Sequence, residues 1–164
     1  MQTTVITLAK ENMKFSAGHF TILSATERER LHGHNYRVAA QVTAVVDEKL
    51  GLSFDYRAYK NKLYELCRSL NEYFLLPGKS PYLAITDTGG KLDAEFAGEV
   101  IPFLTKDVKV LPLKNISVEE LSHWFVEQLS CDKAELAKLK IQKIEVKVFS
   151  GPGQAAATSF SSQT

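Results

Sequence analysis

The chain has 164 residues, of which 45% are hydrophobic and 24% are charged, so its size and composition are those of one globular domain and exclude a disordered, collagen-like or coiled-coil chain. Lys and Arg number 20 against 19 Asp and Glu, and the net charge of +1 provides no basic field for a nucleic-acid partner. No stretch approaches the ~20 apolar residues that cross a bilayer, and the N-terminus lacks a signal-peptide pattern, so we expect a single cytoplasmic domain over residues 1–164 with no membrane partner.

The first part of the chain predicts β-strands. The segment up to about Phe20 has short alternations of apolar residues, with Met13, Phe15 and Ala17 at a period of two. From His34 the run HNYRVAAQVTAVV is rich in β-branched residues and contains no glycine or proline. It predicts a long strand whose one face carries Tyr36, Val38, Ala40 and Val42.

Two later segments have the periodicity of helices. In DYRAYKNKLYELCRSLNEYF, residues 55–74, apolar side chains recur at three- and four-residue steps, which predicts a helix capped by Asp55 and ended by Pro77-Gly78. A second helix is predicted in SVEELSHWFVEQL, because Ser117 and Glu120 have the spacing of a capping box.

Further strands are predicted in the middle and at the end of the chain. The segment PYLAITDTGGKLDAEF predicts two strands joined by a turn at Gly89-Gly90. IQKIEVKVF predicts another strand, and GPGQ turns the chain toward a last one near 155–160. DKAELAKLK is compatible with either a helical turn or a charged loop. The order ββαββαββ predicts the α+β class, with helices packed on one face of an antiparallel sheet.

Three of the four histidines fall close together in this arrangement. His32 and His34 are two residues apart, so both side chains leave the same face of a strand, and a hairpin-like return would bring His19 to the same place. Gly33 between them would leave room for a bound atom. Three imidazoles with a fourth position open are typical of catalytic zinc. The spacing alone also allows a simple strand start with His19 on the surface, and His123 is expected to stay outside the group.

The segments FSAGH and LHGHNYRV resemble the signature of the 6-pyruvoyl-tetrahydropterin synthase / 6-carboxytetrahydropterin synthase family. The similarity continues through Gly51 to Lys60, LNEYFLLP, SVEEL and VKVF, and therefore covers nearly the whole chain. It implies the tunnelling fold, with a four-stranded antiparallel sheet, two helices on one face, and sheets of several subunits joined around a central barrel. It also implies Zn²⁺ on His19, His32 and His34, a pterin substrate, active sites between subunits, and a homo-oligomer that is a hexamer.

The resemblance also suggests which residues transfer protons. Family members carry a cysteine shortly before HGH, whereas this chain has ERER at Glu27–Arg30, and Glu29 is the candidate replacement. The other three residues of this segment are expected to form a solvated charged loop. The family's Asp-His pair after the first helix corresponds to Asn71-Glu72, which makes Glu72 the second candidate catalytic residue.

Two residues are candidates for substrate binding. The family's pterin-anchoring glutamate falls on Ser150, whose single hydroxyl cannot present two ionised acceptors. Losing such a charge-assisted contact costs on the order of 1.5–3 kcal/mol. Glu119, at the start of the second helix, matches a retained family glutamate, although it could equally be a charge that favours the helix start.

These residues predict a zinc-dependent lyase that breaks carbon–oxygen or carbon–carbon bonds in the side chain of 7,8-dihydroneopterin, its triphosphate or a similar pterin. One alternative is a zinc-binding oligomeric relative that binds a ligand without pterin chemistry. Another is an aldolase-like release of 6-hydroxymethyl-dihydropterin, as in the branch of the family that has glutamate in place of cysteine. A weaker third, an RNA binder built on Arg28, Arg30 and Arg37, is disfavoured by the near-zero net charge.

Overall fold

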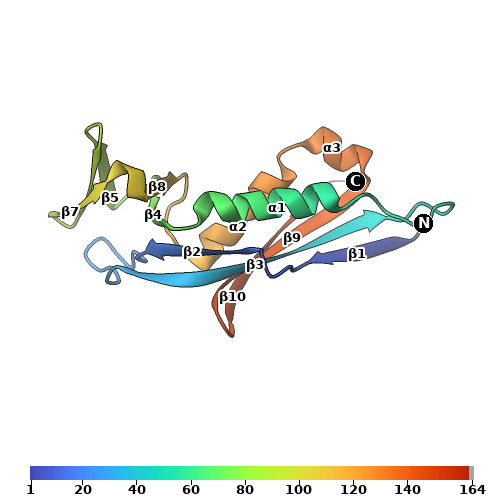
Figure 1. Cartoon of the computed structure of the whole chain (residues 1–164), viewed down its shortest axis with the longest axis horizontal. Coiled ribbons are helices and arrows are strands. Elements are labelled where there is room, and N and C mark those ends of the chain that lie inside the picture. The colour runs from blue at the N-terminus through green and yellow to red at the C-terminus, as the bar shows by residue number, and fades with distance from the viewer. Residues whose placement is uncertain (163–164) are drawn as a thin grey trace.

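The computed structural model describes residues 1–162 and has the α+β class that the sequence predicts (Figure 1). The strands and helices follow one another along the chain as β1 (Thr3–Leu8), β2 (Lys14–His19), β3 (His32–Val45), α1 (Arg57–Leu70), β4 (Tyr73–Pro77), β5 (Leu83–Asp87), β6 (Lys91–Phe96), β7 (Glu99–Leu104), a 3-10 turn (Thr105–Asp107), β8 (Val108–Leu111), α2 (Val118–Ser130), α3 (Lys133–Lys138), β9 (Ile141–Gly151) and β10 (Gln154–Ser161).

A mixed sheet of seven strands forms the main layer, in place of the four-stranded antiparallel sheet that was expected. Its order is β10-β9-β3-β2-β4-β8, and β1 pairs with the second half of β3. The pairs among β1, β2, β3, β9 and β10 are antiparallel, whereas β4 pairs in parallel with both β2 and β8. The sheet is wider than expected because a turn at 11–12 splits the first segment into two strands and because β4 and β8 extend it.

The strand β4 was wrongly expected to be the end of the first helix. Helix α1 ends at Leu70, Asn71 has extended backbone angles and Glu72 has a positive φ of 65°. The Asn71 side chain accepts a hydrogen bond from the Ser16 N–H at 2.9 Å, and the Glu72 N–H donates to the Ser16 carbonyl at 2.7 Å. These contacts with β2 turn the chain into a strand although its apolar residues still have helical spacing.

The core lies between one face of the sheet and helices α1 and α2 (Figure 1). Alternation along β3 buries Tyr36, Val38, Ala40 and Val42, as predicted. Helix α2 begins as the capping box predicts, because the Ser117 hydroxyl accepts a hydrogen bond from the Glu120 N–H at 3.2 Å. The segment that was left open between helix and loop is the short helix α3.

A second, smaller sheet lies at one end of the molecule (Figure 1). The turn at Gly89-Gly90 joins β5 and β6 as predicted, and β7 adds a third antiparallel strand. This sheet has its own apolar cluster, which includes Phe20 and Ile22 from the loop after β2 together with Phe96 from β6. The loop between β2 and β3 therefore packs against a separate small core. Within residues 1–162, every helix is too short or too polar to cross a bilayer.

Candidate metal centre

The antiparallel pairing of β2 with β3 brings the three histidines together. His19 lies opposite His32 in the register, and Ala17 lies opposite His34. Each histidine offers one ring nitrogen to a group in which all these atoms lie within 4.8 Å of one another. In the described part of the chain, His123 stands apart on α2, where it pairs with Glu127 at 3.1 Å.

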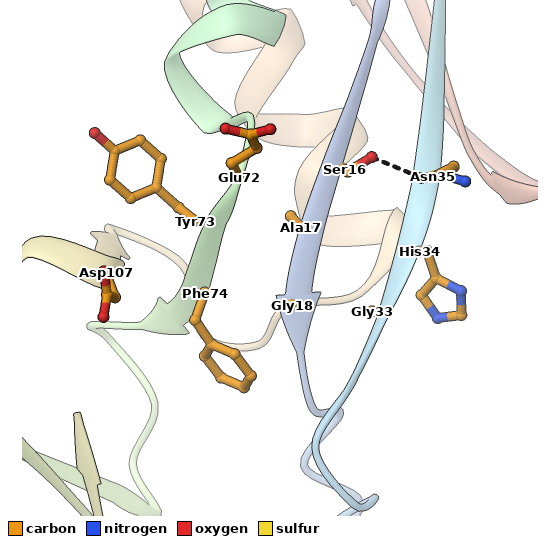
Figure 2. A pocket seen from close by; sticks show the side chains of 10 residues that line it. All are labelled: Ser16, Ala17, Gly18, Gly33, His34, Asn35, Glu72, Tyr73, Phe74 and Asp107. Atoms are coloured by element: carbon orange, nitrogen blue, oxygen red, sulfur yellow. Dashed lines mark hydrogen bonds between the residues drawn. The ribbon is translucent and has the colours of Figure 1, made fainter. Parts of the chain in front are cut away.

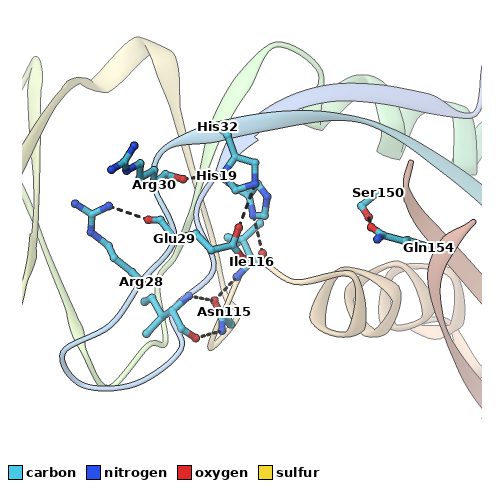
Figure 3. A network of polar contacts seen from close by, with 10 residues as sticks. His19, Arg28, Glu29, Arg30, His32, Asn115, Ile116, Ser150 and Gln154 are labelled. Carbon is cyan, nitrogen blue, oxygen red and sulfur yellow. Dashed lines mark hydrogen bonds and ion pairs between the residues drawn. The ribbon is translucent and has the colours of Figure 1, made fainter. Parts of the chain in front are cut away.

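Backbone carbonyls orient two of the three rings (Figure 3). His19 Nδ1 lies 2.8 Å from the carbonyl oxygen of Ile116, and His32 Nδ1 lies 2.7 Å from that of Arg30. A carbonyl oxygen can only accept, so both Nδ1 atoms carry the hydrogen, and in the neutral ring each Nε2 atom keeps a lone pair. This arrangement, with the second nitrogen held by a backbone oxygen, is usual for metal-binding histidines.

The surroundings of the His19 Nε2 atom indicate whether a metal ion fits between the three rings. His19 is only 5% exposed, and its Nε2 is buried without a hydrogen-bond partner. Leaving a buried polar atom unpaired is costly, and native structures do so rarely. A cation between the three rings would satisfy this nitrogen, and the donor set of three imidazoles fits such a cation.

Burial also favours the metal-binding form of His19 and His34. Desolvation by burial lowers the pKa of His19, and the positive charge of neighbouring imidazolium groups would lower it further. Desolvation also lowers the pKa of His34, with a smaller contribution from His32. A lowered pKa means that the neutral ring prevails at neutral pH, and only the neutral ring has a lone pair to donate.

Glu29 lies beside the histidine group. Its Oε2 is 3.2 Å from His32 Nε2, and the two side chains are 37% and 35% exposed. The residue sits in the loop between β2 and β3, where its N–H donates to the Thr21 carbonyl at 2.9 Å. The structure therefore brings together one candidate catalytic residue and the three candidate ligands.

Glu72 lies elsewhere in the chain. It borders a cavity of about 550 Å³ together with Ser16, Gly18 and Tyr73, and the lining of this cavity extends to His34 on β3. Figure 2 shows the His34 ring pointing away from this acidic side chain, with β2 and β3 between them. Within one chain, Glu72 and His34 thus border the same cavity, but the His34 ring is directed away from the Glu72 carboxylate.

The two candidate substrate-binding residues also lie outside the group. Ser150, in β9, donates a 3.4 Å hydrogen bond to the Gln154 side chain, and this pair stands apart from the histidines in Figure 3. Glu119 is exposed in the first turn of α2, where its carbonyl accepts a hydrogen bond from the Ser122 hydroxyl. Neither residue contacts the histidine group through its side chain.

Gly33 has a different role from the expected one. Because side chains alternate along a strand, a Cβ at this position would point away from the histidines. It would lie 2.9 Å from the backbone oxygen of Ala17, closer than such contacts are found. The glycine therefore permits the close approach of β2 and β3 instead of leaving room for a bound atom.

Sequence reasoning missed three supporting residues. Ile116 acts through its backbone carbonyl, which no side-chain pattern can indicate. Asn115 forms two hydrogen bonds with the backbone of Ile22. The sequence pattern around Asn115 did not indicate a contact with this distant segment. Arg28, which was expected to be solvated, is half-buried against the Phe20 and Phe96 rings, so that expectation was wrong.

Comparison with known proteins agrees with the geometry. The sequence profile of the 6-pyruvoyl tetrahydropterin synthase family matches residues 7–159. The chain therefore belongs to this family. A putative 6-carboxy-5,6,7,8-tetrahydropterin synthase from Pyrococcus horikoshii is 24% identical over 148 residues, which are 90% of this chain and 86% of the relative.

Solved structures show the same fold. The 6-pyruvoyl tetrahydropterin synthase of Plasmodium vivax is 26% identical, has a TM-score of 0.91, and the match covers 98% of this chain and 99% of the other. The protein from Plasmodium falciparum is 27% identical, with a TM-score of 0.91 and the same coverage. Structures of the P. vivax protein include variants in which a glutamate, described as a catalytic residue, is replaced by cysteine or alanine. The tunnelling fold is thereby confirmed.

Proposed function

We propose that this member of the 6-pyruvoyl tetrahydropterin synthase family is a zinc-dependent lyase acting on the side chain of 7,8-dihydroneopterin, its triphosphate or a similar pterin. The observation that carries the proposal is the buried, unpartnered Nε2 of His19 within a group of three histidines. His19, His32 and His34 would hold the Zn²⁺, since imidazole nitrogen suits zinc better than it suits Mg²⁺ or Ca²⁺. When bound, the ion would act as a Lewis acid toward the side-chain oxygens of the substrate.

Glu29 is the proposed proton-transfer group. Its carboxylate lies 3.2 Å from a candidate ligand, so a side chain of the substrate bound at the histidines would be within its reach. Its carboxylate would act first as a base and remove a proton from the substrate side chain. The catalytic glutamate of the P. vivax protein supports this role.

The remaining candidate residues fit a site shared between subunits. The Glu72 side chain lies away from the His34 ring although both residues border one cavity, so in a homo-oligomer it would serve the histidine group of another copy. Six copies are expected from the resemblance. Glu119 and Ser150 would then lie toward the pterin ring, and Ser150 would offer a single hydroxyl where a carboxylate anchors the ring in other members.

A second reaction, cleavage of the substrate side chain, is supported by the residues that occupy the usual catalytic positions. Glu29 stands where cysteine is usual, and Asn71-Glu72 stands where an Asp-His pair is usual. Replacing the histidine by a carboxylate removes a group that can pass a proton on near pH 7. This favours cleavage of the side chain with release of 6-hydroxymethyl-dihydropterin over the internal rearrangement that gives a pyruvoyl group.

The test is to incubate the zinc-loaded protein with 7,8-dihydroneopterin and with its triphosphate and to identify the products by mass spectrometry. A 6-pyruvoyl, 6-carboxy or 6-hydroxymethyl product would support the lyase and would distinguish the three reactions. Protein stripped of metal by a chelator and then reloaded is the matched control. If the loaded protein leaves both compounds unchanged, the pterin lyase is excluded, and the non-catalytic zinc-binding relative becomes the better account.

A further inference from the structure

The loop between β2 and β3 must hold Glu29 in place, because catalysis depends on where its carboxylate lies. The loop forms a small hairpin of its own, with a bridge between Ile22 and Arg28 and a hydrogen bond from the Glu29 N–H to the Thr21 carbonyl at 2.9 Å. Asn115 anchors one side of this hairpin through hydrogen bonds of 3.0 and 2.8 Å to the backbone of Ile22.

Arg28 anchors the other side. Its guanidinium lies 5.1 Å from the centroid of the Phe20 ring and 6.0 Å from that of Phe96, distances at which a cation is attracted to an aromatic face. Its Nη1 also donates a hydrogen bond to the carbonyl oxygen of Glu29 at 2.9 Å (Figure 3). One side chain therefore joins the backbone of Glu29 to two rings.

The two rings belong to different parts of the molecule. Phe20 follows directly after His19 at the end of β2, whereas Phe96 ends β6 in the small sheet. Both rings are buried in the same apolar cluster, at 1% and 3% exposure. Arg28 thus fixes the Glu29 backbone relative to the strand that supplies a candidate metal ligand.

We propose that Arg28 is a positioning residue for Glu29, and that the sheet of β5, β6 and β7 supports this function by supplying the Phe96 ring. The inference rests on the proposed role of Glu29 in proton transfer. A side chain that is merely solvated would have neither of the two ring contacts nor the hydrogen bond to its neighbour's carbonyl.

The central variant is Arg28→Leu, which keeps an apolar side chain between the rings but removes the cation and the hydrogen-bond donor. We expect kcat for the pterin substrate to fall by roughly 10- to 100-fold, because a displacement of about 1 Å is enough for such a loss. KM and zinc content are expected to remain at wild-type values. Arg28→Lys keeps a cation beside Phe20 and is expected to recover part of the rate.

A double-variant cycle separates positioning from a general structural effect. If Arg28 acts through Glu29, then adding Arg28→Leu to Glu29→Gln should lower kcat by no more than about twofold, since the group to be positioned has already been lost. An equal loss in both backgrounds would overturn the proposal. Glu27→Ala is the matched control, because the Glu27 side chain is exposed and takes part in no hydrogen bond or ion pair among residues 1–162.

Hydrogen exchange gives a readout that needs no turnover. The Glu29 N–H should exchange at least about 10-fold faster in Arg28→Leu than in the wild type or in Glu27→Ala, while amides of β3 keep their protection. Unchanged exchange at Glu29 would overturn the proposal even if the enzyme is active. If wild-type protein turns over no pterin but the exchange rate changes as expected, the proposed function fails while the positioning of Glu29 by Arg28 stands.

Discussion

His19 Nδ1 donates a hydrogen bond of 2.8 Å to the carbonyl oxygen of Ile116, which joins the last residue of β2 to the segment that leads into α2. The bond fixes the tautomer of His19 and leaves its Nε2 buried without a partner. The position of this nitrogen is therefore set before any cation binds.

Replacing His19 by alanine should abolish stable metal binding. Changing a residue that only supports a ligand typically costs 10- to 100-fold in metal affinity, so loss of a ligand should cost more than about 100-fold. The measurement is zinc content after dialysis together with a competition titration against a chromogenic chelator. His123→Ala is the control, since this histidine is exposed on α2 and should leave the zinc content unchanged. Full zinc content in His19→Ala would contradict the site.

Replacing Glu29 by glutamine should separate catalysis from metal binding. The amide keeps the size of the side chain but cannot take up a proton, so kcat should fall by roughly 10²- to 10⁴-fold. Zinc content and the unfolding midpoint should not change, because Glu29 is a half-exposed loop residue outside the group of three nitrogens. Steady-state kinetics and metal analysis on the same preparation test both statements. A variant with wild-type kcat would remove Glu29 from the mechanism.

The metal-free protein should lose stability as the pH falls. Burial lowers the folded-state pKa of His19 and His34 below their ordinary value of 6.5, so below that pH the unfolded chain binds more protons than the folded one. Stability then rises with pH, and the contribution present above pH 6.5 is lost on acidification. Chemical denaturation from about pH 8 to about pH 5 should show this slope. His19→Gln should flatten it, and an unchanged slope would show that His19 is not the cause.

Adding a methyl group at Gly33 should destabilise the fold near the histidines. The new Cβ would lie 2.9 Å from the Ala17 backbone oxygen, so β2 and β3 would have to separate. Overpacking of this kind costs about 1–3 kcal/mol of unfolding free energy. Gly151→Ala is the matched control, because nothing lies within 4 Å of a Cβ there and the change should stay within about 0.5 kcal/mol. Equal unfolding free energies for the two variants would show that β2 and β3 can separate without a cost in stability.

The sequence predicted those parts of the molecule that depend on local pattern. Strand alternation placed Tyr36 and Val38 in the core, the capping box marked the start of α2, and the spacing of His32 and His34 put both on one face. These signals are strong because each depends on neighbours a few residues away. The antiparallel return that brings His19 into register was inferred from the same kind of pattern.

The features that could not be predicted depend on contacts between distant segments. The residues of β4 kept a helical spacing, and only their hydrogen bonds to β2 made them a strand. The position of Glu72 after α1 did not indicate that the His34 ring would be directed away from its carboxylate. Arg28 belonged to a charged run, and its two aromatic partners became neighbours only through the packing of the small sheet.

The hydrogen bond between His19 and Ile116 limits which changes in sequence this site tolerates. Since the acceptor is a main-chain oxygen, the Ile116 side chain takes no part in the hydrogen bond itself and contributes through its packing in the core. The number of residues between β8 and α2 is under a much stricter constraint. A one-residue insertion or deletion there would shift the oxygen away from the imidazole, and metal affinity would fall although all three histidines were retained.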